Sequence, residues 1–121
     1  MKGVLVIAHG SRAKETEATL ESVLSMVKTK LPAQPEILIE CAFMEFSERT
    51  VEKGVSALTA NGVTEIKIVP YFLFMGIHLK EDIPNMVAEC AENFPGVKIT
   101  MGEPLGVDER LADIIVDRIK D

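Results

Sequence analysis

The sequence contains few of the residues that build disulfide frameworks or closed metal centres. Only two cysteines occur in 121 residues, and the absence of a Cys-x-x-Cys pair argues against a zinc ribbon or a redox dithiol. Cys41 lies in a strand pattern and Cys90 on the apolar side of a helix pattern, so we expect both to be reduced thiols in the core. A chain of this length buries about 70% of its unfolded surface, so no disulfide is needed.

The sequence also lacks an excess of positive charge and any long apolar segment. Its 13 basic and 19 acidic residues give a net charge of −6 without a basic run, which disfavours nucleic acid and anionic membranes as partners. No apolar stretch reaches membrane-spanning length, and the N-terminus has no pattern of a secretory signal. We therefore expect a cytoplasmic protein.

Three common catalytic motifs are missing as well. The sequence has no Gly-x-x-x-x-Gly-Lys-Ser/Thr phosphate loop, no Gly-x-Gly-x-x-Gly dinucleotide loop and no Gly-x-Ser-x-Gly nucleophile elbow. The acidic residues near the C-terminus are interpreted as the solvated side of a last helix; they are Asp108, Glu109, Asp113, Asp117 and Asp121.

What is present is a regular alternation of strand and helix patterns. Apolar, β-branched runs predict strands over residues 3–8, 36–43, 65–71 and 97–101, and helical spacing predicts helices over 20–31, 48–61, 83–94 and 107–119. Such alternation is typical of parallel strands joined by right-handed crossovers. We predict a single three-layer α/β domain over residues 1–121. Its four-stranded parallel sheet has the order 2-1-3-4, with helices on both faces.

The only two histidines follow predicted strands of this sheet. His9 comes directly after the first strand, and His78 lies in the connection 72–83 after the third. Ligands of open α/β sheets bind beyond the carboxyl ends of the strands, and the order 2-1-3-4 makes the first and third strands neighbours. Imidazole is the commonest protein metal ligand and accepts protons near neutral pH. We therefore predict that both imidazoles face one crevice.

The residues around His9 favour a binding role over a purely structural one. A histidine in this position could simply cap the next helix. However, Gly10 permits close backbone approach, and Ser11 is a suitable N-cap residue. Together with Arg12 and the helix N-terminus, Ser11 would form an anion-binding corner.

His78 and Glu45 complete the candidate site. His78 could be a solvated loop residue, but the apolar run 71–75 before it is typical of a pocket wall or a partner interface. Glu45 follows the second strand, and its side chain points either into solvent or into the site. In the second case two imidazoles and one carboxylate would bind Fe, Co, Ni or Zn while leaving coordination positions open.

Two segments carry a resemblance to a known family. Residues 4–12 (VLVIAHGSR) and 68–84 (IVPYFLFMGIHLKEDIP) closely resemble the short, single-domain CbiX-type sirohydrochlorin chelatases of the class II chelatase family. The resemblance implies insertion of a divalent metal into sirohydrochlorin in tetrapyrrole biosynthesis, with Co²⁺ foremost and Ni²⁺ or Fe²⁺ as alternatives. The metal is then a substrate, and no tightly bound cofactor is expected. His9, His78 and Glu45 match the catalytic and metal-binding residues.

The resemblance also assigns residues to the macrocycle and to a partner. Apolar walls would come from Met44, Phe72, Phe74 and Met75, and the carboxylate rim of the substrate would meet Ser11, Arg12 and Lys80. Short members of the family work as homodimers, which the apolar stretch 72–79 would accommodate. The chain departs from the family pattern at two positions: Met44 replaces a usual Leu, and Arg49 stands where Pro is common.

Three other functions remain as alternatives. The same histidines could serve a dimeric metallochaperone or metal-binding module that binds metal without catalysis. The pair His9-Gly10 also occurs in histidine phosphatases, but there Arg precedes the histidine, where this chain has Ala8. A pure interaction domain would leave both histidines incidental, and their placement at the same edge argues against it.

Overall fold

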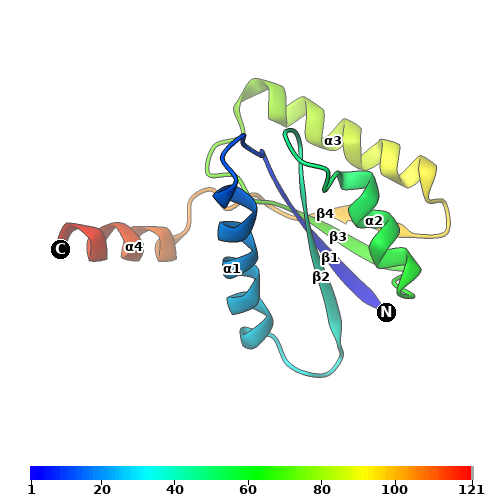
Figure 1. Cartoon of the computed structure of the whole chain (residues 1–121), viewed down its shortest axis with the longest axis horizontal. Helices are drawn as coiled ribbons and strands as arrows, with labels where there is room; N and C mark the ends of the chain where they lie inside the picture. The colour runs from blue at the N-terminus through cyan, green and yellow to red at the C-terminus, as the bar shows by residue number, and fades with distance from the viewer. Residues whose placement is uncertain (121) are drawn as a thin grey trace.

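A computed structural model describes residues 1–120 and shows strands and helices alternating along the chain (Figure 1). The elements are β1 (Lys2–Ala8), α1 (Glu15–Lys30), β2 (Ile37–Phe43), α2 (Val51–Ala60), β3 (Glu65–Pro70), α3 (Gly76–Asn93), β4 (Lys98–Met101) and α4 (Glu109–Lys120). No helix within residues 1–120 is both long enough and apolar enough to span a membrane.

The four strands form one parallel sheet in the order β2-β1-β3-β4, which confirms the predicted topology. Ala8 at the end of β1 pairs in register with Phe43 at the end of β2, and Ile7 pairs with Pro70 at the end of β3. The carboxyl ends of these three strands therefore lie side by side. We call this side of the sheet the carboxyl edge.

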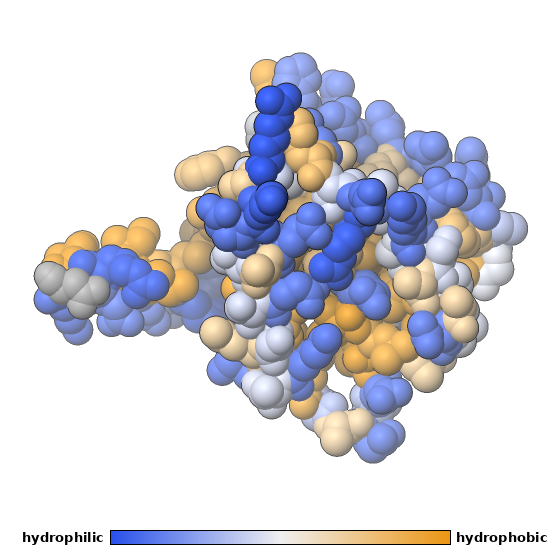
Figure 2. All heavy atoms as spheres, viewed as in Figure 1, coloured by the Kyte–Doolittle hydropathy of each residue, from blue (hydrophilic) through white to orange (hydrophobic). Residues whose placement is uncertain are grey.

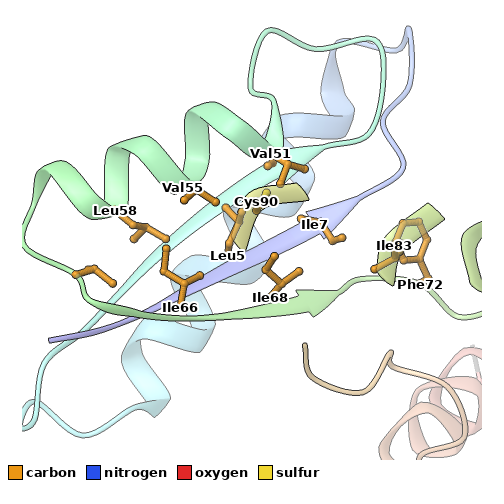
Figure 3. Close-up of a cluster of buried hydrophobic side chains, with 12 residues drawn as sticks. Leu5, Ile7, Val51, Val55, Leu58, Ile66, Ile68, Phe72, Ile83 and Cys90 are labelled. Carbon is orange, nitrogen blue, oxygen red and sulfur yellow. The ribbon is translucent and has the colours of Figure 1, made fainter. Parts of the chain in front are cut away.

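Apolar side chains on both faces of the sheet form two core clusters. On one face, Leu5, Ile7 and Ile68 pack with residues of α2 and α3, among them Val55 and Ile83 (Figure 3). On the other face, α1 packs its Leu20 and Leu24 on β1 and β2, together with Val6, Ile39 and Phe43. Burial on both faces explains why the central strands are almost continuously apolar. The predicted layers, with helices on both faces, are confirmed.

The two cysteines are buried and free, as predicted from their positions in apolar patterns. Burial raises the pKa of the Cys41 thiol to about 12, and a hydrogen bond to Glu21 adds to this effect. Burial also raises the pKa of Cys90. Because the thiolate is the reactive form, neither cysteine is suited to nucleophilic chemistry.

The start of α3 differs from the sequence prediction. The segment 72–83 is predicted as a connection, whereas α3 begins at Gly76 and contains Pro84. Gly76 has φ of 66°, which lets the chain turn into the helix, and Leu79 extends the buried stripe of Ile83 and Cys90 by one turn. Packing of this first turn therefore outweighs the disruptive effect of the proline.

The last helix also differs from the prediction, because it does not cover a face of the sheet. In Figure 1, α4 projects away from the body of the molecule, and none of its residues is buried. Asp113 and Asp117 are exposed, as predicted, and Asp121 lies outside the described residues. Asp108 precedes α4, and its hydrogen bonds with Arg110 hold the pKa of the Asp108 carboxyl well below its usual range.

Candidate active site

His9 and Glu45 are brought together by backbone pairing that continues past the ends of two neighbouring strands. The amide of Met44 donates to the carbonyl of Ala8 at 2.9 Å, and the amide of Glu45 donates to the carbonyl of His9 at 3.1 Å. The parallel register of β1 and β2 is therefore maintained for one more step at the carboxyl edge. Side chains that are 36 positions apart in the sequence become neighbours because of this pairing.

Gly10 allows the two segments to approach this closely. Its φ is 96°, a left-handed conformation that residues with a Cβ rarely adopt. A Cβ at this position would also overlap the backbone carbonyl oxygen of Glu45. The predicted role of Gly10 in close backbone approach is thus explained by a specific contact.

The side chains of His9 and Glu45 lie within hydrogen-bonding distance on the open surface of the carboxyl edge. His9 Nε2 lies 2.8 Å from Glu45 Oε1, and the two side chains are 61% and 47% exposed. The ring of Phe72 meets the imidazole edge-on, with 6.5 Å between ring centroids and an interplanar angle of 82°. Phe72 and Glu45 thus orient an imidazole that remains accessible to a ligand.

The loop 44–50 that carries Glu45 is held in place by α1. The amide of Phe43 donates to the carbonyl of Arg49 at 2.8 Å and closes the loop. The Ser47 hydroxyl donates to the Glu17 carboxylate at 3.0 Å, and the Arg49 guanidinium donates to Glu21 at 2.9 Å. Helix α1 therefore fixes the position of Glu45 relative to His9.

Arg49, one of the departures from the family pattern, belongs to a small polar network under this loop. The Glu21 carboxylate accepts hydrogen bonds from the Cys41 thiol and from Arg49, and these bonds hold the pKa of Glu21 below its usual value. The same guanidinium lies 3.8 Å from the Glu40 carboxylate. Arg49 thus has a structural role between β2, α1 and the loop.

Phe46 is a candidate site residue that the sequence analysis did not identify. It is 52% exposed, its φ is 59°, and the Arg12 guanidinium stacks over its ring at 4.9 Å from the centroid. A positive φ is unusual for a bulky residue, and such strain is concentrated at functional sites. A large aromatic residue in a polar loop directly after Glu45 was the signal available in the sequence.

His78 lies on the first turn of α3 and is exposed. Within residues 1–120, no three His, Cys, Asp or Glu side chains are grouped so that they could hold one metal ion together. The structure therefore brings His9 and Glu45 into contact but does not bring His78 to them. Within a single chain, two of the three predicted donors, His9 and Glu45, form a pair, and the imidazole of His78 is separate from them.

The apolar residues predicted to line the substrate site differ in exposure. Phe74 is 86% exposed, Met44 and Met75 are half-buried against the core on the α2 and α3 face, and Phe72 is buried next to His9. A hollow of about 250 Å³ next to Met44 runs between α2 and α3, but neither His9 nor Glu45 lines it.

The predicted anion-binding corner is only partly present. Ser11 does not cap a helix, because α1 begins four residues later; its hydroxyl instead accepts a hydrogen bond from the Ala13 amide at 3.1 Å. The first turn of α1 carries Glu15 and Glu17, whose negative charges already complement the helix N-terminus. Arg12 remains as the cation on this side of the site, and the exposed Lys80 lies on α3.

This parallel α/β domain has the fold of a solved sirohydrochlorin chelatase. The fold superposes with a TM-score of 0.87 and 33% identity on the sirohydrochlorin chelatase SirB from Bacillus subtilis subspecies spizizenii, solved in complex with cobalt. The family model CbiX matches residues 3–121. The chain belongs to the CbiX family.

Curated relatives carry two related names. The chain is 38% identical over 121 residues to the sirohydrochlorin ferrochelatase of Priestia megaterium, and it spans 44% of that protein's length. It is 35% identical over 121 residues to the sirohydrochlorin cobaltochelatase of Sulfurisphaera tokodaii, of which it spans 93%. The solved SirB chain is also longer, since 50% of it is covered. The chain thus spans about half the length of some relatives and nearly all of others.

Proposed function

We propose that this chain is a sirohydrochlorin metal chelatase, a lyase that inserts a divalent metal ion into the macrocycle. The single observation that carries the proposal is the His9–Glu45 pair, at 2.8 Å, on the exposed carboxyl edge of a CbiX-family fold. The names of relatives that match all 121 residues support the same reaction. In this proposal residues 1–121 act as one chelatase domain in the cytoplasm.

The chemistry of insertion suits an accessible imidazole. Each turnover places one M²⁺ in the macrocycle and releases two pyrrole protons, so a base must accept protons while the ion loses its water. A neutral imidazole has one nitrogen lone pair that can do either task. His9 fits this role because its side chain is 61% exposed and stands beside a carboxylate that stabilises positive charge.

Glu45 then acts as a positioning residue for His9. With a proton on Nε2, the imidazole donates to Glu45 Oε1, and Nδ1 is left with its lone pair toward the ligand. A carboxylate in this arrangement fixes the tautomer and raises the basicity of a metal-binding histidine. The second Glu45 oxygen remains available to the incoming ion.

His78 would supply the second imidazole, because α3 follows β3 and β3 is the neighbour of β1. The exposed Phe74 would contact the face of the macrocycle, together with Met44, which precedes Glu45, and Met75, which lies shortly before His78. Arg12 and Lys80 would meet its carboxylates. We further propose a homodimer, since one open edge covers only one side of a flat substrate.

The identity of the metal follows from the relatives only in part. The names of the relatives refer to both cobalt and iron. Imidazole and carboxylate donors bind Co²⁺, Ni²⁺ and Fe²⁺ with affinities that follow the general order of divalent first-row metals, so these donors do not select one metal. We propose Co²⁺ as the first candidate, with Fe²⁺ and Ni²⁺ as alternatives.

An anaerobic visible-absorbance assay with sirohydrochlorin and each of Co²⁺, Ni²⁺ and Fe²⁺ tests the proposal. We expect the wild-type chain to accelerate metal insertion, and His9→Ala and His78→Ala to lower the rate by about 100-fold or more. Thr19→Ala, at an exposed position of α1, is the matched control and should retain the full rate. Metal binding with no acceleration over the protein-free reaction would favour a metallochaperone instead.

A further inference from the structure

Arg12 is held at the carboxyl edge by an aromatic ring rather than by a carboxylate. Its guanidinium carbon lies over the Phe46 ring, 4.9 Å from the centroid, which is the geometry of a cation–π contact. Arg49 and Arg110 pair with carboxylates at 2.9 and 2.6 Å, whereas Arg12 has no such partner among residues 1–120. A contact with a ring face occupies no hydrogen-bond acceptor, so the N–H donors of Arg12 remain available to an anion.

The position of Phe46 is not explained by the fold alone. Its side chain belongs to neither core cluster and is 52% exposed. Its φ of 59° lies in the left-handed region, which favours glycine and disfavours a bulky side chain. A residue with a strained backbone and little burial contributes through some other interaction. The contact with Arg12 is the interaction that the structure records for this ring.

The loop after β1 and the loop after β2 contact each other through two pairs of side chains. Glu45 contacts His9, and the next residue, Phe46, contacts Arg12. The hydrogen bond from the Glu45 amide to the His9 carbonyl fixes the spacing between the two loops. Figure 2 shows hydrophilic and apolar side chains next to one another over the ends of these loops. The same two loops therefore carry the candidate proton acceptor and a fixed cation.

We propose that Phe46 is a positioning residue for Arg12, and that the guanidinium so held binds a carboxylate on the rim of sirohydrochlorin; this role rests on the proposed function. Arginine binds a carboxylate best through two parallel N–H···O bonds, and this geometry requires an oriented guanidinium. The ring supplies that orientation, and it lowers the side-chain entropy that binding would otherwise cost. The Phe46–Arg12 pair thus contributes to substrate affinity, whereas His9 and Glu45 contribute to the chemical step.

An aromatic partner differs from an acidic partner in the charge that it leaves for a ligand. The Glu21 carboxylate fixes Arg49 and also compensates its charge. The Phe46 ring fixes Arg12 without a formal negative charge, so Arg12 keeps its attraction for an anion. This attraction is needed because Glu45 lies in the same loop as Phe46 and the whole chain has a net charge of −6. A substrate that bears carboxylates therefore meets a cation that is held in place but not neutralised.

Equilibrium dialysis of metal-free sirohydrochlorin measures binding separately from metal insertion. We expect Phe46→Leu to raise Kd about 2- to 5-fold, and Arg12→Ala to raise it about 10-fold or more. Phe46→Tyr keeps the ring and should bind as the wild type does. Adding Phe46→Leu to Arg12→Ala should weaken binding no further, because the ring acts only through the guanidinium. Met26→Ala, at an exposed apolar position of α1, is the matched control and should leave Kd unchanged.

The absorbance assay with Co²⁺ then separates an effect on affinity from an effect on the chemical step. Phe46→Leu should raise KM by about the same factor as Kd and change kcat less, whereas His9→Ala should mainly lower kcat. Equal Kd values for the wild type and Phe46→Leu, or a further loss from Phe46→Leu when Arg12 is already absent, would overturn the proposal. A wild-type chain that binds sirohydrochlorin without inserting metal would contradict the proposed function alone, and one that binds none would contradict both.

The variant Phe46→Gly distinguishes a positioning role of the ring from a role in folding. Glycine adopts a φ of 59° without strain, so the urea midpoint of this variant should stay near that of the wild type. Its Kd for sirohydrochlorin should nevertheless rise at least as much as that of Phe46→Leu, because the guanidinium loses its ring. A Phe46→Gly variant that is clearly less stable but binds as the wild type does would show that the ring serves the fold, and would overturn the proposal.

Discussion

Gly10 separates His9 from the turn that leads into α1, and two properties of this position require glycine. Its φ is 96°, and a Cβ would overlap the Glu45 carbonyl oxygen. The first property concerns backbone conformation alone, whereas the second links this residue directly to the loop that carries Glu45. The geometry of the site therefore depends on a residue that carries no side chain.

We predict that Gly10→Ala destabilises the protein by about 1–3 kcal/mol and lowers the insertion rate, because the loop 44–50 must move away from β1. Gly62→Ala is the matched control: its φ is 87°, and a Cβ there has nothing within 4 Å. It should lose stability through backbone strain and keep its rate. Urea unfolding and the absorbance assay measure the two effects. A Gly10→Ala variant with the wild-type rate would contradict the prediction.

The His9–Glu45 pair should affect activity far more than stability. Exposed ion pairs contribute about 0–1 kcal/mol, so Glu45→Ala should change the unfolding free energy little. If Glu45 orients His9, the same substitution should lower the insertion rate about 10–100-fold, while Glu45→Gln, which can still accept from Nε2, should lose less. Glu48→Ala, exposed on the same loop, is the control. Equal losses in the Gln and Ala variants would argue against an orienting role.

At the scale of elements, the helices differ in what stabilises them. Helix α2 starts with a side-chain cap, buries Val51, Val55 and Leu58, and directly follows the loop that carries Glu45. Helix α4 buries none of its described residues. Helix α2 is thus stabilised both by its cap and by its buried face.

We predict that Thr50→Ala destabilises the protein by about 1 kcal/mol, because the Thr50 hydroxyl accepts a hydrogen bond from the Lys53 amide at 3.2 Å at the start of α2. Thr19→Ala, in the second turn of α1, should be neutral or slightly stabilising, since alanine has the higher helix propensity. Thermal or urea unfolding of both variants measures the difference. A Thr50→Ala variant as stable as the wild type would show that the cap contributes nothing.

At the scale of the whole molecule, burial of Cys41 connects the core to the pH dependence of stability. Its thiol pKa is raised from 9.0 to about 12, first by burial and then by the hydrogen bond to Glu21. Above pH 9 the unfolded chain therefore loses this proton while the folded chain keeps it. Because the unfolded state then binds fewer protons, stability falls as the pH rises toward 12.

We predict that this loss has a slope of up to about 1.4 kcal/mol per pH unit above pH 9. Cys41→Ser can keep the hydrogen bond to Glu21 but does not titrate in this range, so its unfolding free energy should decline less steeply. Urea midpoints from pH 8 to pH 11 for both proteins isolate the contribution of Cys41 from that of lysine and tyrosine. If the urea midpoints of the two proteins declined in parallel with pH, Cys41 would make no contribution to the pH dependence of stability.

Much of the fold and part of the site follow from local patterns in the sequence. Alternating apolar runs and helical stripes predicted the four strands and the buried cysteines, because short-range periodicity reports directly which side chains face a core. The strand order was expected from the fold class, not from these patterns, and the structure confirms it. Placing His9 and Glu45 at one edge needed only the parallel topology. The predicted start of α3 is too late. Gly76 and Pro84 are visible in the sequence and indicate a loop, whereas the packing of Leu79 on the core is visible only in the tertiary structure.

Tertiary structure alone decided the contacts within the site and the direction of the last helix. The sequence shows Gly10, Glu45 and Phe46, but only the paired backbones reveal that Gly10 leaves room for the Glu45 carbonyl and that Arg12 stacks on Phe46. The sequence likewise determined that α4 has an apolar stripe. Whether that stripe covers its own sheet depends on the path of the connection 102–108, and the physical reason is general: amphipathicity says that a surface must be buried, not which surface buries it.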